Sequence, residues 1–98
     1  MKLLKNQYQD ILEVLSDLKI SEERLSLIKR KGKIQLRIEG IDGYFEFFRR
    51  KSTSLTSEDH QWQKSEHYEL NIGGQTAMVS DWDKVISYLK TWLNSPQR

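Results

Sequence analysis

The sequence predicts an α+β fold, in which an antiparallel five-stranded meander sheet is flanked by an N-terminal and a C-terminal helix. Two observations lead to this prediction. Apolar residues recur every three to four positions near both ends of the chain, and at every second position between them. The 98 residues suit one domain, because autonomous domains usually hold about 100–150 residues. We therefore expect a single domain over residues 1–98 with the element order α-β-β-β-β-β-α.

The first helix is predicted over residues 1–20. Its apolar positions advance by four, three, four and three residues, which places them on one helical face: Leu4, Tyr8, Ile11, Leu15 and Leu18. The same spacing matches a short heptad seam. The stripe can therefore pack on the sheet of its own chain or, in addition, join a second copy.

The middle of the chain, residues 24–79, is predicted to form the sheet, because polar and apolar residues begin to alternate at Leu25. A two-residue turn between the first two strands sets their register and places Leu27 opposite Leu36. This register brings five aliphatic residues of the two strands to one face: Leu25, Leu27, Ile34, Leu36 and Ile38. We expect that face to cover the core.

The second turn is predicted at residues 40–43, where an Asp-Gly pair adopts positive φ at low cost. Pairing Glu39 with Tyr44 across this turn puts Phe45 and Phe47 on the core face. The same pairing sets Glu46 opposite Arg37. Two independent turns thus agree on one core face.

A polar loop is predicted over residues 52–63, where Ser and Thr are frequent and only Leu55 and Trp62 are apolar. Long loops of this kind are usually functional or disordered. Alternation then resumes up to residue 79. A second helix is predicted over residues 81–94, with Ser80 as its N-terminal cap.

Basic residues concentrate in the first half of the predicted sheet. Residues 24–51 hold nine Lys or Arg and three Asp or Glu, whereas the whole chain has a net charge of +2. The predicted register brings seven of these cations to one end of the sheet: Lys29, Arg30, Lys31, Lys33, Arg49, Arg50 and Lys51. We call this set the basic edge. Charges within a Debye length of about 8 Å repel one another, so folding gains nothing from crowding these cations. We therefore predict that the basic edge binds an anionic partner. Alternatively, these side chains protect the strand ends from pairing, or Glu58 and Asp59 neutralise them.

The sheet face opposite the core is predicted to carry aromatic rings beside arginines. Single-stranded nucleic acids are bound on such surfaces, because each base stacked on a ring contributes about 1–3 kcal/mol. Our candidate stacking or anchor residues are Tyr44, Phe48 and Arg37 on this face and Trp62 in the polar loop over 52–63. In the alternative interpretation the rings lie under one of the helices or in a dimer seam, and Trp62 closes the end of the sheet.

Several chemistries lack the residues they need. The absence of cysteine excludes a disulfide framework, a thiolate metal site and a cysteine nucleophile. The two histidines, His60 and His67, match no metal-binding motif. We therefore predict no metal, no cofactor and no catalysis; a small enzyme using His67 with Glu69 is the weakest alternative.

Together these patterns predict a small non-catalytic binding domain that acts through protein–protein contacts, as an accessory subunit, adaptor or modulator. Its partner would be another protein or a second copy of the chain. The alternative is single-stranded or structured nucleic-acid binding through the basic edge. We expect no membrane partner, because the apolar runs hold two or three residues, against about 20 in a spanning helix. A cytoplasmic location is expected, because the short apolar run at the N-terminus does not resemble a secretory signal.

Overall fold

The predicted α+β fold is confirmed by a computed structural model, which describes residues 2–55 and 62–94. The elements run in the order α1 (Lys5–Asp17), a 3-10 turn η1 (Glu22–Arg24), β1 (Leu25–Arg30), β2 (Lys33–Ile38), β3 (Phe45–Leu55), β4 (Trp62–Ile72), β5 (Gln75–Val79) and α2 (Trp82–Asn94). The five strands form one antiparallel sheet in sequence order. No helix in these described segments is long and apolar enough to cross a membrane.

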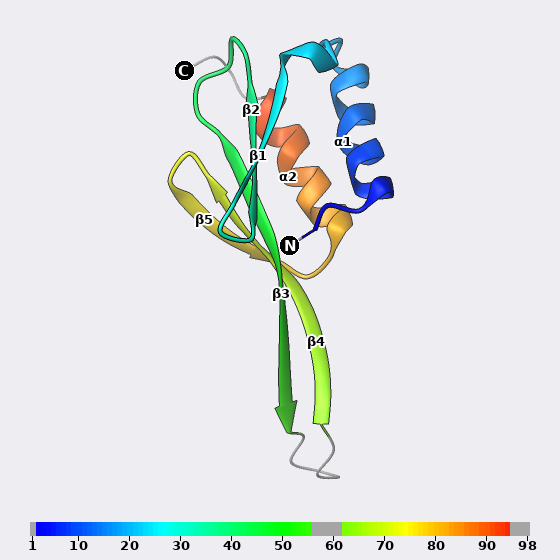
Figure 1. The fold of residues 1–98 in the computed structure, drawn as a ribbon, viewed down its shortest axis with the longest axis vertical. Coiled ribbons are helices and arrows are strands. Elements are labelled where there is room, and N and C mark those ends of the chain that lie inside the picture. Colours follow the sequence, from blue (N-terminus) through cyan, green and yellow to red (C-terminus); the bar gives the residue numbers. More distant parts are fainter. Residues whose placement is uncertain (1, 56–61, 95–98) are drawn as a thin grey trace.

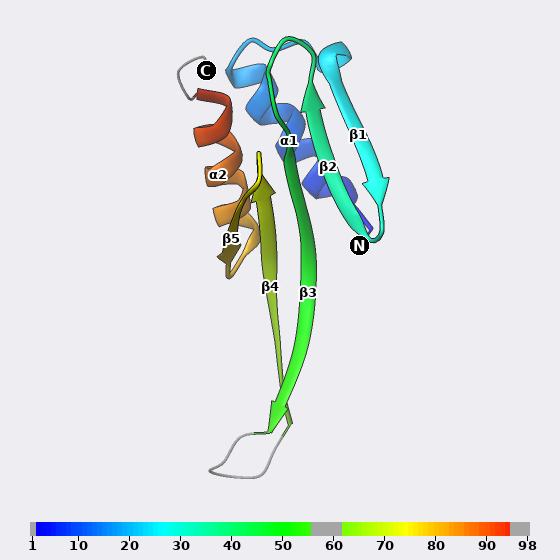
Figure 2. The same cartoon turned by 90° about the vertical axis from the view of Figure 1, so that its left-hand side faces the viewer.

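Both helices pack on the same face of the sheet. Figure 1 shows the sheet with α1 and α2 on one side of it, and Figure 2 shows the opposite sheet face in the foreground with the helices behind. A hydrogen bond of 2.8 Å from Trp82 Nε1 to Asp10 Oδ2 joins the two helices. One sheet face is therefore covered, and the other is open.

The covered face and the two helices enclose the core. The largest fully buried side chains are Phe45, Phe47, Ile11, Leu15, Leu36, Leu70, Leu89 and Val85. Aromatic pairs tie α2 to β3: the ring centroids of Phe45 and Trp92 lie 5.8 Å apart, and those of Phe47 and Trp82 lie 5.5 Å apart. In the predicted helical stripe, Ile11 and Leu15 are each only 1% exposed. The centre of the stripe is thus used for packing on the chain's own sheet.

The first predicted register is confirmed. Strands β1 and β2 pair from Leu25 opposite Ile38 to Arg30 opposite Lys33. The two turn residues between them have φ values of 51° and 79°. Two consecutive positive φ angles are the signature of the type I′ turn that suits two-residue hairpins.

The second predicted register is wrong by two residues. We expected Glu46 to face Arg37, whereas it faces Gln35. The reason is that Glu39 pairs elsewhere: its backbone N–H donates to the carbonyl of Arg24 over 2.9 Å, and the Arg24 guanidinium donates to the carbonyl of Glu39. The connection before β3 is therefore longer than expected. A shift of two residues leaves every side chain on its predicted face.

The predicted loop over 52–63 is wrong at both ends. Strand β3 continues to Leu55 and β4 begins at Trp62, and the two residues pair with each other. These strand ends form a two-stranded arm that projects beyond the helices (Figure 1). An arm without a helix layer needs no alternation of polar and apolar residues, so the sequence pattern did not reveal it. Residues 56–61 lie outside the described part of the chain.

The predicted N-terminal cap of α2 is wrong by one residue. Asp81 Oδ1 accepts a hydrogen bond of 3.0 Å from the backbone N–H of Lys84, as the cap of a helix beginning at Trp82 does. The hydroxyl of Ser80 instead donates to Asp81 Oδ2 over 3.4 Å. A carboxylate at this end is also favoured by the helix dipole.

Candidate functional site

The open face of the sheet contains a shallow groove of about 810 Å³. Strands β2 to β5 supply its lining, which includes Lys33, Glu46, Phe48, Arg50, Glu69 and Met78. Met78 on β5 is the most exposed large apolar side chain of the described residues, at 68%. The groove thus combines apolar side chains with charges of both signs.

Three of the four candidate stacking residues lie on this open face. Arg37 lies over the Tyr44 ring, with 5.6 Å between the guanidinium carbon and the ring centroid. The Phe48 ring has two cations near its face, Lys33 at 5.3 Å and Arg50 at 6.0 Å. Such contacts attract a cation to the negative face of a ring. Both rings are therefore already occupied by cations of the chain itself.

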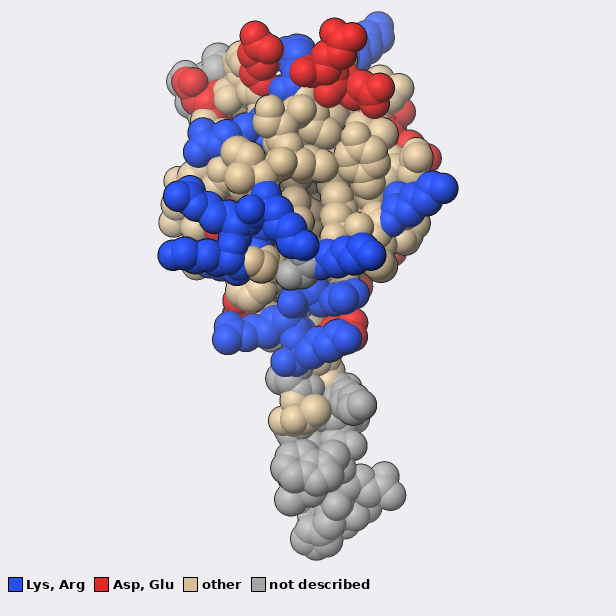
Figure 3. Space-filling model, viewed as in Figure 1, with Lys and Arg blue, Asp and Glu red and all other residues tan. Residues whose placement is uncertain are grey.

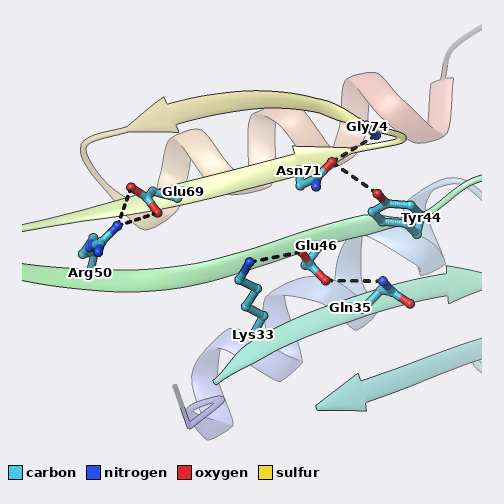
Figure 4. Close-up of polar contacts among 8 residues, drawn as sticks. All are labelled: Lys33, Gln35, Tyr44, Glu46, Arg50, Glu69, Asn71 and Gly74. Atoms are coloured by element: carbon cyan, nitrogen blue, oxygen red, sulfur yellow. Dashed lines mark hydrogen bonds and ion pairs between the residues drawn. The ribbon is translucent and has the colours of Figure 1, made fainter. Parts of the chain in front are cut away.

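Carboxylates of the open face lie beside two of these three cations, Lys33 and Arg50 (Figure 4). Glu46 Oε1 lies 4.0 Å from Lys33 Nζ, and Glu46 Oε2 accepts a hydrogen bond of 3.3 Å from Gln35 Nε2. On the neighbouring pair of strands, Arg50 Nη1 donates to both oxygens of Glu69, over 3.2 and 3.3 Å. The charges of Lys33 and Arg50 are therefore balanced, whereas Arg37 donates to the amide oxygen of Gln35 over 2.9 Å.

Asn71 is a member of the open face that the sequence analysis missed. Its Oδ1 accepts hydrogen bonds from the Tyr44 hydroxyl over 3.4 Å and from the backbone N–H of Gly74 over 3.0 Å (Figure 4). It thereby fixes the Tyr44 ring and the β4–β5 turn together. The available signal was an Asn just before a Gly-Gly turn, where Asn side chains commonly bond to the backbone.

His67 and Glu69, the residues of the weakest alternative, do lie together on β4. His67 Nε2 is buried without a hydrogen bond inside the described region, and it lies 3.6 Å from Glu69 Oε1. Both oxygens of Glu69 are bonded to Arg50. Residues 2–55 and 62–94 contain no group of His, Asp and Glu that could hold a metal ion.

The residues of the basic edge do not all point the same way. Lys29 pairs with Ile34 and Arg49 with Tyr68, and both partners are buried residues of the covered face. Because side chains alternate along a strand, the basic edge is divided between the two sheet faces. Lys33 and Arg50, from its two sequence clusters, nevertheless lie over the same Phe48 ring. Figure 3 shows Lys and Arg side chains gathered in the lower part of the body, away from the acidic residues at the top.

Three of the seven cations in the basic edge are paired with carboxylates. Besides the pairs of Lys33 and Arg50, Lys51 Nζ lies 3.7 Å from Glu66 Oε1. The other four make no ion pair in the part of the chain that the structure describes: Lys29, Arg30, Lys31 and Arg49. Glu58 and Asp59, which we considered as neutralising residues, lie outside the described residues.

The fourth candidate anchor, Trp62, begins β4 opposite Leu55, and the environment of its side chain lies outside what the structure describes.

Comparisons of the chain with protein families, with curated proteins and with solved structures find no match. The geometry of the open face and of the basic edge therefore provides the basis for a functional proposal.

Proposed function

We propose that this chain is a small non-catalytic binding domain that acts through protein–protein contact, with the open face of the sheet as its contact surface. The observation that supports this most strongly is the groove on that face, which neither α1 nor α2 covers. Aromatic residues, Met and Arg are enriched at protein interfaces, and Phe48, Met78 and Arg50 line this groove. We keep the cytoplasmic location as part of this proposal, and cell fractionation checks it.

The charge balance of the open face favours a protein partner over a polyanion. Glu46 and Glu69 lie beside Lys33 and Arg50, and a nucleic-acid backbone would be repelled by these two carboxylates. Protein interfaces, in contrast, use fixed charges of both signs to set specificity. The role of Glu69 as the ion-pair partner of Arg50 also supports a binding surface rather than a proton-transfer site.

Affinity capture with matched variants tests this proposal. Met78→Glu places a charge on the exposed rim of the groove, whereas Lys90→Glu introduces the same residue on the exposed side of α2. We expect a set of proteins to be retained by the wild type and by Lys90→Glu and lost from Met78→Glu, with or without nuclease. Retention of the same proteins by Met78→Glu, or their loss after nuclease treatment, would contradict the proposal.

A second candidate function is single-stranded nucleic-acid binding, which the four cations without an ion pair favour. Phosphates could bind along these residues of the basic edge, but a base stacking on Phe48 would first have to displace Lys33 or Arg50. Titration of a labelled oligonucleotide at several salt concentrations tests this function. Binding should weaken steeply with salt, and also when Arg30→Ala and Lys31→Ala are combined. An affinity weaker than about 100 μM at moderate salt would contradict it.

A further inference from the structure

Strand β1 forms one edge of the sheet, and no other strand pairs with its outer side in the described part of the chain. Five of its six residues are exposed, among them the apolar Leu27 and Ile28 at its centre. Half of the backbone N–H and C=O groups of an edge strand point away from the sheet. An exposed edge of this kind is a template for pairing with another strand.

The turn after β1 shows which residues present these outward groups. Arg30 and Lys33 close a two-residue turn, and the residues that close such a turn exchange hydrogen bonds with each other. Because hydrogen-bonded positions alternate along an antiparallel pair, the groups of Leu25, Leu27 and Lys29 point outward.

The edge has opposite charges at its two ends. The turn η1, which precedes β1, contains Glu22 and Glu23, whereas Lys29, Arg30 and Lys31 follow the apolar centre. Figure 3, which faces this edge, shows acidic side chains at the top, an uncharged region in the middle and basic side chains below. In an antiparallel pair of two such edges, the acidic end of each would meet the basic end of the other.

We propose that β1 pairs with β1 of a second copy of this chain, antiparallel and about a two-fold axis that passes through Leu27 perpendicular to the sheet. Leu27 then meets its own counterpart and Leu25 meets Lys29 of the second copy. Beyond the strand ends, the η1 turn with Glu23 comes beside the β1–β2 turn with Lys31 of the second copy. Such an isologous contact uses the same patch of both chains. The two sheets continue as one, and all helices lie on the same side, because a two-fold axis normal to the sheet preserves its faces.

This inference goes beyond the proposed function, because it concerns the edge of the sheet and not its open face. Met78 lies on β5, the strand at the opposite edge. Dimerisation through β1 therefore leaves the groove beside β5 free. A monomeric protein would contradict the inference and leave the open-face proposal standing, whereas Met78→Glu tests only the latter.

Sedimentation equilibrium of the full chain tests the dimer, over concentrations from about 1 μM to 1 mM. We expect a concentration-dependent dimer for the wild type and a monomer for Leu27→Pro. Proline removes the outward N–H of Leu27 but none of the bonds to β2, and edge strands tolerate proline at such positions. Circular dichroism confirms that the variant is folded. A wild type that is monomeric throughout, or a folded Leu27→Pro variant that still dimerises, would overturn the inference.

A charge exchange tests the register without touching the strand. Glu23→Lys or Lys31→Glu alone sets like charges opposite each other twice per dimer, and each should weaken dimerisation several-fold. Both substitutions in one chain restore opposite charges and should restore the wild-type dissociation constant. Glu13→Lys on α1 is the control for the change in net charge. If the wild type, the two single variants and the double variant dimerise equally, the proposed pairing is wrong. It is also wrong if the double variant is the weakest dimer of these four proteins.

Discussion

At the scale of single residues, one buried polar contact joins the first helix to the sheet. Gln7 and Tyr68 are only 3% and 7% exposed, and Gln7 Nε2 donates to the Tyr68 hydroxyl over 3.0 Å. Gln7 Oε1 also accepts a hydrogen bond from the backbone N–H of Leu4. A buried amide is costly unless it is hydrogen-bonded, so this contact secures the start of α1 against β4.

Replacing Tyr68 by Phe should therefore destabilise the protein more than the loss of one oxygen atom suggests. The Gln7 amide would stay buried without its acceptor, which costs about 1–3 kcal/mol. Tyr44→Phe is the matched control, because the Tyr44 hydroxyl is half-buried and makes a long hydrogen bond of 3.4 Å to Asn71. Urea unfolding of both variants measures the difference. Equal losses of unfolding free energy would show that the buried hydrogen bond of Tyr68 stabilises the protein no more than the half-buried one of Tyr44 does.

Single-residue features could be predicted from sequence where they depend on alternation alone. Tyr44, Phe48 and Arg37 were expected on one sheet face, and they lie there. The partner of Glu46 was not predictable in this way, because its register depends on the contact of Arg24 with Glu39 across fifteen positions of sequence. Long-range contacts of this kind leave no periodic trace in a sequence.

At the scale of elements, the connection between β2 and β3 depends on a close approach of Arg24. A Cβ atom added to Gly40 would lie 2.9 Å from Arg24 Nη2, whereas one added to Gly43 would meet nothing within 4 Å. The two glycines have nearly equal φ values, +91° and +90°. They therefore share a positive φ and differ in steric surroundings.

Alanine at either glycine should destabilise the protein, and the loss should be larger at Gly40. Positive φ costs a residue with a Cβ atom about 1–2 kcal/mol, and this cost is common to both variants. Gly40→Ala in addition displaces the Arg24 guanidinium from the carbonyl of Glu39. Thermal unfolding compares the two variants, and in an Arg24→Ala background their losses should become equal. A larger loss at Gly43 would contradict the role of Arg24.

Helices and strands could be predicted from the sequence where packing between the helices and the sheet imposes a regular pattern of apolar residues. Both helices and the β1–β2 hairpin were expected close to their observed positions, because each helix has one buried face and a two-residue turn sets the register of the hairpin. The arm formed by the ends of β3 and β4 was expected to be a loop. Its backbone pairs from Ser52 opposite Ser65 to Leu55 opposite Trp62, beyond the helix layer that makes alternation necessary.

At the scale of the whole molecule, the arrangement of layers determines which surfaces are available. The two amphipathic helices could have covered opposite faces of the sheet, and nothing in their sequence patterns selects between the two arrangements. In the structure both lie on one face. The open face thus keeps its groove, and the charges separate along the long axis (Figure 3).

The uncovered sheet face, on which the proposed function depends, can be tested most directly by thiol labelling at two adjacent residues of β5. The chain has no cysteine, so Met78→Cys and Val79→Cys each introduce one thiol. Met78 is exposed, whereas Val79 is 8% exposed beneath the helix layer. We predict that the thiol at 78 reacts with Ellman's reagent as fast as in the unfolded chain, and that the thiol at 79 reacts at least about a hundredfold more slowly, because it requires local opening. Slow labelling at both positions, in a monomeric sample, would show that the supposedly open face is covered.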